Sequence, residues 1–280
     1  MAIAALFVLL WSTGFIGTKL GLPYAEPFTF LLVRFWIVAA LMLVIALATR
    51  ASWPKSWHEA GHTAVAGLLI HGVFLSGVFS SMYNGIPAGV TALVVGLQPL
   101  LTATVVGPLL GERVSFRQWS GFVLGLVGVT LVLLRKLSFD ISDISGLLWC
   151  GAALLGITAG TLYQKKFSSF MDLRSGTVIQ YVAAGLAMSV LAPLTETMKI
   201  TWSWEFIFAL LWLSVVLSVG AITLLFVLIR RGKASEVASL FYLVPPCTAL
   251  IAYFVFGETL GPIALLGMAI AVVGVALVNR

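Results

Sequence analysis

The segment His58-Glu59-Ala60-Gly61-His62 matches the H-E-x-x-H pattern of zinc-dependent proteases. In that pattern two histidines one helical turn apart bind zinc, and the glutamate activates a water molecule. Catalytic zinc needs a third protein ligand, and the sequence offers no Asp, Glu or Cys in a second recognisable motif at the same depth. A helix start, with Glu59 beside the positive end of the helix dipole, explains the segment more simply. An intramembrane zinc protease is therefore the less favoured alternative, and neither a metal site nor a cofactor is predicted.

Two other ionisable side chains lie inside long apolar stretches, where such groups need a partner. His71 is ten residues into the stretch 61–83. Its imidazole could bind a solute or titrate as a gate, or it could form a neutral hydrogen bond between helices. Arg34 lies within the stretch 28–49. Its guanidinium could hold a solute carboxylate or reach the outer headgroups.

Polar and aromatic residues near the middle of other apolar stretches complete a candidate binding site. Rings and hydroxyl groups suit sites that are mostly apolar with a few orienting polar groups, although any single member is more often a packing residue between helices. Together with His71, the predicted substrate-binding residues are Trp11, Ser12, Thr13, Gln98, Thr158, Tyr163, Gln164 and Tyr242.

Prolines interrupt two of the apolar stretches near their centres. Pro99 lies halfway along 88–110, and the pair Pro245-Pro246 lies halfway along 234–256. Proline removes a backbone donor and clashes with the preceding helical turn. Symmetric helix breaks at membrane depth often border a binding site. These prolines are therefore predicted to act as hinges or gates, with a plain packing kink as the alternative.

The elements that position these residues follow from composition. The chain has 280 residues, of which 61% are hydrophobic and only 9% charged, with a mean hydropathy of +1.11. A soluble domain carries about 25% charged residues, so this composition indicates a protein that crosses the membrane many times. Stretches of about 20 apolar residues suffice to cross the bilayer. Ten are predicted: 2–21, 28–49, 61–83, 88–110, 115–135, 144–164, 174–195, 204–230, 234–256 and 260–279.

The charge distribution predicts the orientation. Eleven of the sixteen Lys and Arg residues fall in connections on the side of the N-terminus, four fall on the opposite side, and Arg34 lies within a stretch. Cytoplasmic connections are rich in Lys and Arg, which places both termini in the cytoplasm. No run of Lys and Arg exceeds two residues, so the net charge of +6 does not indicate a nucleic-acid partner.

An internal repeat is the most informative feature of the sequence. Residues 88–133 align with 234–279 without a gap, at a constant offset of 146 residues. The same offset pairs Lys19 with Lys165, and it pairs Arg34 with Gln180, which favours a structural role for Arg34. The prediction is an all-α integral membrane protein built from two five-helix repeats, 1–140 and 141–280. Because five is odd, the second repeat must be inverted in the membrane.

The repeat also carries a family resemblance. The segments Ala88…Gly111-Glu112-Arg113…Gly121…Gly128-Val129 and Ala234…Gly257-Glu258…Gly267…Gly274-Val275 resemble the two signature halves of EamA-type carriers of the drug/metabolite transporter superfamily. Trp11-Ser12 and Arg34-Phe35 are similar to that pattern too, whereas Thr259 departs from it. The resemblance implies ten helices and export of amino acids or other small metabolites. Within the superfamily, the chain looks most like the bacterial exporters of aromatic amino acids and paraquat.

These observations favour a carrier over other classes of protein. All ten Asp and Glu residues fall at the ends of the stretches or in connections, and a proton-coupled cation exporter needs an embedded acid. A multidrug or cationic-compound exporter is therefore the alternative, and a channel, which needs a ring of charges or carbonyls, is disfavoured. The expected partners are a small-molecule solute and the lipid of a bacterial inner membrane. The Gly-spaced stretches 115–135 and 260–279 are predicted to pack closely, within the chain or in a homodimer.

Overall fold

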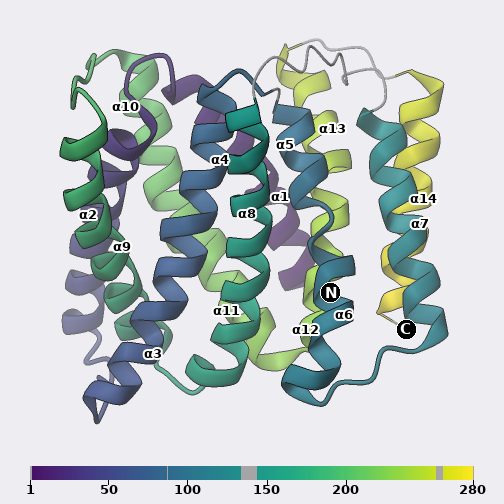
Figure 1. The fold of residues 1–280 in the computed structure, drawn as a ribbon, viewed down its shortest axis with the longest axis horizontal. Helices are drawn as coiled ribbons and strands as arrows, with labels where there is room; N and C mark the ends of the chain where they lie inside the picture. The colour runs from purple at the N-terminus through teal and green to yellow at the C-terminus, as the bar shows by residue number, and fades with distance from the viewer. Residues whose placement is uncertain (1, 87, 134–143, 257–260, 280) are drawn as a thin grey trace.

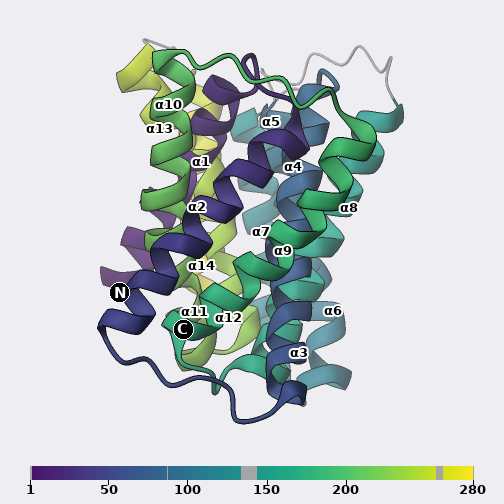
Figure 2. The same cartoon turned by 90° about the vertical axis from the view of Figure 1, so that its left-hand side faces the viewer.

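The computed structural model describes residues 2–86, 88–133, 144–256 and 261–279, and this part of the chain is helical apart from one isolated bridge between Ala25 and Ile200. The helices run side by side in a single bundle (Figures 1 and 2). We call the end with the connections 22–26 and 196–203 the upper end, and the end with 49–56 and 232–233 the lower end, as drawn in Figure 1. Gly257, Glu258 and Thr259, and the boundary predicted at residues 140–141, lie outside the described residues.

The first half of the chain contains seven α-helices and one π-helical segment: α1 (Ala2–Gly21), α2 (Pro27–Ala48), α3 (Trp57–Gly67), η1 (Leu68–Val73), α4 (Phe74–Tyr83), α5 (Ala88–Val95), α6 (Gln98–Leu110) and α7 (Phe116–Leu133). The second half contains α8 (Ile144–Tyr163), η2 (Gln164–Ser168), α9 (Leu173–Thr195), α10 (Trp204–Leu211), η3 (Trp212–Ala221), α11 (Ile222–Arg231), α12 (Ala234–Ser239), η4 (Leu240–Leu243), α13 (Val244–Phe256) and α14 (Pro262–Val278).

Six continuous helices of the described chain are long and apolar enough to cross a membrane: Ala2–Gly21, Pro27–Ala48, Trp57–Tyr83, Ile144–Ser168, Leu173–Thr195 and Trp204–Arg231. They match six of the ten predicted stretches. The other four stretches also contain helices, but these are shorter or interrupted. The prediction of an all-helical membrane protein is confirmed.

The two central prolines begin helices instead of bending them. Pro99 lies in the first turn of α6, after a turn at residues 96–97, and Pro245 lies in the first turn of α13, after the 3₁₀ segment η4. In a first turn proline gives up no intrahelical hydrogen bond, and its fixed φ suits the helix. The stretch predicted as one kinked helix over 88–110 is therefore two helices.

Helices distant in sequence pack in pairs. The most extensive contacts join α7 to α14 and α2 to α9 (Figure 1), and further contacts join α4 to α8 and α1 to η3. At the first of these pairs the backbones touch. A Cβ atom added to Gly274 would lie 2.6 Å from the backbone nitrogen of Gly125, and one added to Gly128 would lie 2.5 Å from that of Ala271. The two Gly-spaced stretches that were predicted to pack closely therefore pack against each other within the chain.

Carboxylates tie α2 to α9 at the upper end. Glu196, which ends α9, accepts hydrogen bonds from the backbone nitrogens of Phe28 and Thr29, each at 2.7 Å, in the first turn of α2. Glu26, which precedes α2, accepts from the backbone nitrogen of Thr197 at 2.7 Å. Each carboxylate thus satisfies donors across the junction, and those at the start of α2 would otherwise lack partners.

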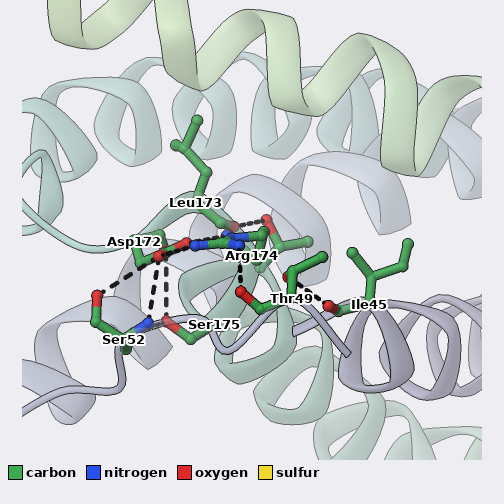
Figure 3. A network of polar contacts seen from close by, with 8 residues as sticks. Ile45, Thr49, Ser52, Asp172, Leu173, Arg174 and Ser175 are labelled. Atoms are coloured by element: carbon green, nitrogen blue, oxygen red, sulfur yellow. Dashed lines mark hydrogen bonds and ion pairs between the residues drawn. The ribbon is translucent and has the colours of Figure 1, made fainter. Parts of the chain in front are cut away.

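A second polar network ties the same helices at the lower end (Figure 3). Asp172 accepts from the backbone nitrogens of Arg174 at 2.9 Å and Ser52 at 3.3 Å. The Arg174 guanidinium pairs with Asp172 at 2.6 Å and donates to the Thr49 carbonyl at 3.0 Å. The Arg174 side chain holds the pKa of Asp172 at about 2, below its ordinary value. Polar contacts therefore join α2 to α9 at both ends.

Candidate functional site

A cavity lies between α1, α2, α4, η3 and α11, so both halves of the chain contribute to its wall. It is a small, partly open cavity, with a volume of about 40 Å³ for the centres of water-sized molecules. Along α1 the lining runs from mid-helix toward the upper end. The lining residues are Trp11, Gly14, Phe15, Thr18, Arg34, Phe74, Leu75, Val78, Leu213, Leu217 and Ile222.

Trp11 forms the inner wall of the cavity through ring contacts with other helices. Its ring stacks on Phe74 with centroids 6.1 Å apart and meets Phe241 edge-on at 5.3 Å. Phe7, one helical turn away, lies 5.2 Å from it. The indole is 93% buried by this packing (7% exposed). Aromatic contacts of this kind give a wall that is rigid and apolar.

Arg34 brings a positive charge to the same cavity. Its side chain is only 2% exposed, so it does not reach the headgroups, which was one of its two predicted roles. The guanidinium donates to the hydroxyl of Ser218 from Nε at 3.2 Å and from Nη2 at 3.0 Å. The predicted residues Trp11 and Arg34 therefore meet at one site. Ser218 was missed because a serine in an apolar stretch carries no signal of its own.

His71 belongs to a buried polar chain and not to the cavity lining. Its ring stacks on Tyr181 with centroids 4.0 Å apart, and its Nε2 lies 3.3 Å from the amide oxygen of Gln180. Gln180 in turn donates to the amide oxygen of Gln164 at 2.7 Å. The structure thus joins two predicted site residues, His71 and Gln164, through Gln180. The sequence had indicated Gln180 only as the residue that the repeat pairs with Arg34.

The other predicted site residues lie at contacts between helices. The Ser12 hydroxyl is 2.6 Å from the Val8 carbonyl and 3.2 Å from the Val244 carbonyl. The Thr13 hydroxyl accepts from the indole of Trp212 at 2.9 Å. The residues that carry these groups, Ser12, Thr13 and Trp212, do not line the cavity. Ser12 and Thr13 therefore support α1 from behind Trp11.

Three further predicted site residues are buried away from the cavity lining, namely Gln98, Thr158 and Tyr242. The Gln98 amide donates to the Thr161 hydroxyl at 3.4 Å, and the Thr158 hydroxyl donates to the Leu154 carbonyl at 2.7 Å. Tyr242 is fully buried against Gly125, and its hydroxyl has no partner within the described residues. The amide oxygen of Gln98 is likewise unpaired there. Unpaired buried polar atoms are costly, and each could accept a water or solute hydrogen bond in another conformation.

The H-E-x-x-H segment forms the capped start of α3. The Glu59 backbone nitrogen donates to the Ser56 hydroxyl at 3.2 Å, and the Glu59 carboxylate accepts from the Lys55 backbone at 2.8 Å. His62 lies 3.2 Å from His58 and 2.6 Å from the Tyr163 hydroxyl, so Tyr163 contacts α3. No group of three potential metal ligands occurs within the described ranges. The geometry is that of a capped helix start: Ser56 is the N-cap, and the Glu59 carboxylate reaches back to the residue before it.

Two charged groups make contacts at the lower end, one within the second half and one between the two halves. The Lys165 ammonium donates to the backbone carbonyls of Ile229, at 3.0 Å, and Gly232. Glu112 accepts from the Ala234 backbone nitrogen at 3.0 Å, at the start of α12. Lys19 is the counterpart of Lys165 by the repeat offset. It is exposed near the upper end and has no partner within the part of the chain that is described. This asymmetry was not predicted, although the Lys19–Lys165 pairing was visible in the repeat.

A cavity walled by both halves of a bundle with membrane-length helices agrees with the class of membrane transporters. The EamA-like transporter family matches this chain twice, over residues 1–134 and 144–280, and the chain belongs to that family. It is a multi-pass protein of the bacterial inner membrane.

Similar proteins agree with this assignment. The "Uncharacterized transporter YvbV" of Bacillus subtilis is 27% identical over 98% of this chain and 90% of its own length. The "Probable amino-acid metabolite efflux pump" of Salmonella typhimurium is 25% identical over 97% of this chain and 92% of its own length. A solved crystal structure with 21% identity shares the fold with a TM-score of 0.82, over 99% of this chain and 96% of that one. The relatives do not single out the aromatic-amino-acid and paraquat exporters.

Proposed function

We propose that this chain exports small metabolites, amino acids foremost, by alternating access between two inverted repeats, residues 1–140 and 141–280. The proposed topology has ten membrane crossings and both termini in the cytoplasm, which makes the lower end cytoplasmic. Two observations support the repeats. The family matches the two halves separately, and α6 and α13 begin at residues 98 and 244, which differ by the same offset as the sequence repeat.

The observation that carries the proposal is the asymmetry between the two ends. The cavity lining on α1 extends from Trp11 toward the upper end, whereas at the lower end Glu112 bonds to α12 across the two halves and Lys165 bonds to α11 within the second half. An inverted repeat can exchange the conformations of its halves. In the opposite state the lower end would release these contacts, and Lys19 would take the role of Lys165 at the upper end.

Within this cycle, the predicted site residues divide into three groups. Trp11 and Arg34 contact the solute directly. The turn before Pro99 and the 3₁₀ segment before Pro245-Pro246 serve as the hinges, because interrupted helices can rotate about the break. The remaining members support the wall or line the path in the opposite state, and they are Ser12, Thr13, His71, Gln98, Thr158, Tyr163, Gln164 and Tyr242.

The cavity does not favour a cationic solute. Its described lining contains Arg34 and no carboxylate, and a buried cation needs a counter-charge. A multidrug exporter of cationic compounds would therefore need an acid that the described wall does not supply. The described lining therefore favours a carrier of small metabolites over the exporter of cationic compounds that was the alternative from the sequence.

Counterflow in proteoliposomes tests the proposal. Vesicles loaded with mixed amino acids would be given labelled threonine or phenylalanine, with and without a pH gradient. Accumulation above that of protein-free vesicles is the expected result, and accumulation only with the gradient would show proton coupling. The His71→Ala and Gln98→Ala variants are expected to express normally and to transport more slowly. Absence of accumulation for every amino acid would overturn the proposal for this solute class.

A further inference from the structure

Arg34 is a buried cation without a counter-ion. Its guanidinium is bonded to Ser218, a neutral hydroxyl. Among the residues that the structure describes, no carboxylate forms an ion pair with it. Removing one charge from water without a compensating charge is unfavourable. An anionic ligand bound in the cavity would supply the counter-charge that Arg34 lacks.

Ser218 is arranged to leave that anion a place. Its hydroxyl donates its own proton to the Leu213 carbonyl at 3.0 Å, five residues earlier in the π-helical segment η3. Its oxygen accepts from both the Nε and Nη2 groups of Arg34. These two donors form the planar fork that binds carboxylates in bidentate fashion. The serine oxygen occupies, in this structure, the position that a carboxylate oxygen would take.

The rest of the lining suits an apolar body. Phe15, Phe74, Leu213 and Leu217 provide rings and branched aliphatic groups, and Thr18 adds a hydroxyl. The described lining offers no carboxylate to hold an ammonium group. The described acidic residues lie at or near helix ends, namely Glu26, Glu59, Glu112, Asp172, Glu196, Glu205 and Glu236.

From these contacts we infer that the cavity binds a monocarboxylate with an apolar or aromatic body, held by the Arg34 guanidinium in place of the Ser218 hydroxyl. The inference rests on the proposed carrier function and narrows its substrate class. An α-ammonium group is not required, so 2-oxo acids and aryl-alkyl carboxylates are ligands alongside apolar amino acids. Amines that lack a carboxylate are not.

Three probes of nearly equal size separate the chemical groups. 3-Phenylpropanoate carries only the carboxylate, L-phenylalanine carries both charges, and phenethylamine carries only the ammonium. Binding to the purified full chain in detergent would be measured by titration calorimetry. The expected result is that 3-phenylpropanoate binds at least as tightly as phenylalanine, and at least about 30-fold more tightly than phenethylamine.

Variants at the guanidinium test its role. Arg34→Gln is expected to weaken 3-phenylpropanoate by at least about 30-fold and to abolish the preference over phenethylamine. Arg34→Lys, which keeps the charge but loses the fork, is expected to fall between Arg34→Gln and the wild type. Ser214→Ala, in the same π-helical segment but outside the lining, is the matched control and is expected to leave the ranking unchanged. Because the ranking of probes is compared within each variant, a general loss of stability does not imitate the result.

Each outcome decides between the two proposals. If phenylalanine binds or shows counterflow while 3-phenylpropanoate does not, the ammonium is required and the inferred class is wrong, whereas the carrier function stands. If Arg34→Gln and Arg34→Lys keep the wild-type ranking, Arg34 is structural and the inference fails. If no probe binds and no amino acid shows counterflow, the proposed function itself fails. Because the wild-type ranking needs no variant, the inference can be overturned even if Arg34→Gln does not fold.

Discussion

The ammonium of Lys165 donates to the backbone carbonyl of Ile229 at 3.0 Å, which fastens η2, the segment that follows α8, to the last turn of α11. A helix C-terminus presents carbonyls without partners, and its partial negative charge attracts a cation. Lys165 supplies both the donors and the charge. Since Lys165 and Ile229 both belong to the second half, Lys165 acts as a latch within that half at the lower end.

Removing the latch is expected to open the lower end. In Lys165→Gln, a cysteine placed at the buried Ala238 should react with a maleimide reagent about fivefold faster than in the parent, for a contact of about 1 kcal/mol. The background would lack the native Cys150 and Cys247. Lys166→Gln, the exposed neighbour, removes the same charge and should leave the rate unchanged. Equal labelling in both variants would show that Lys165 does not hold this end closed.

The carboxylate of Glu196 is expected to stabilise the start of α2. Because it accepts from the backbone nitrogens of Phe28 and Thr29, Glu196→Ala leaves two helix donors without a partner and should cost about 1–2 kcal/mol. Thermal unfolding in detergent measures the loss. Thr195→Val is the control, since that hydroxyl bonds only within its own helix, to Leu191. A melting temperature equal to that of the control would contradict the capping role.

The lowered pKa of Asp172 is expected to make the free energy of unfolding depend on pH in the acid range. Its pKa is lowered to about 2 by the Arg174 side chain, so the folded state binds the proton less readily than the unfolded state. The contribution is complete above about pH 4 and is lost as the pH falls from there toward 2. Unfolding curves of the wild type and Asp172→Asn should therefore converge only as the pH falls to about 2 and separate fully above about pH 5. Parallel curves across this range would refute the assignment.

The backbone contact between α7 and α14 predicts sensitivity to one methyl group. In Gly274→Ala the new Cβ would lie 2.6 Å from the Gly125 nitrogen, and overpacking of this kind costs about 1–3 kcal/mol. Gly151→Ala on α8 is the control, because nothing lies within 4 Å of its added Cβ. Chemical unfolding in mixed micelles would compare the two. If both variants are as stable as the wild type, the helices can separate without loss.

Long apolar stretches made most of the fold predictable. The ends of α1, α2 and α9 fall within one residue of the predicted bounds, because a bilayer allows few alternatives to a continuous helix. A break at Pro99 was predicted from the sequence, but not that it divides the stretch into two helices. Hydropathy cannot distinguish a bent helix from two consecutive ones, since the composition is the same.

The candidate site was less predictable than the fold. Trp11 and Arg34 were identified because their types are unusual at that depth. Leu213 and Leu217, which face them in the cavity, resemble every other leucine of the chain. Their position depends on how η3 packs against α1, and that is decided by contacts between residues about 200 positions apart. His71 was correctly expected to need a partner, but only the packed structure shows that Gln180 provides it.

The pairing of α7 with α14 also has a consequence for the surrounding lipid. α14 has 17 residues, which span about 26 Å. α9, in the pair at the opposite end of the long axis in Figure 1, has 23 residues and spans about 35 Å. A hydrocarbon layer of about 30 Å matches neither. α2 and α9 run obliquely in Figure 2, which shortens the thickness that they span, whereas a short helix such as α14 is expected to thin the bilayer around it. Lipids with shorter acyl chains are therefore expected to collect along α14, which gives this transporter an uneven annulus.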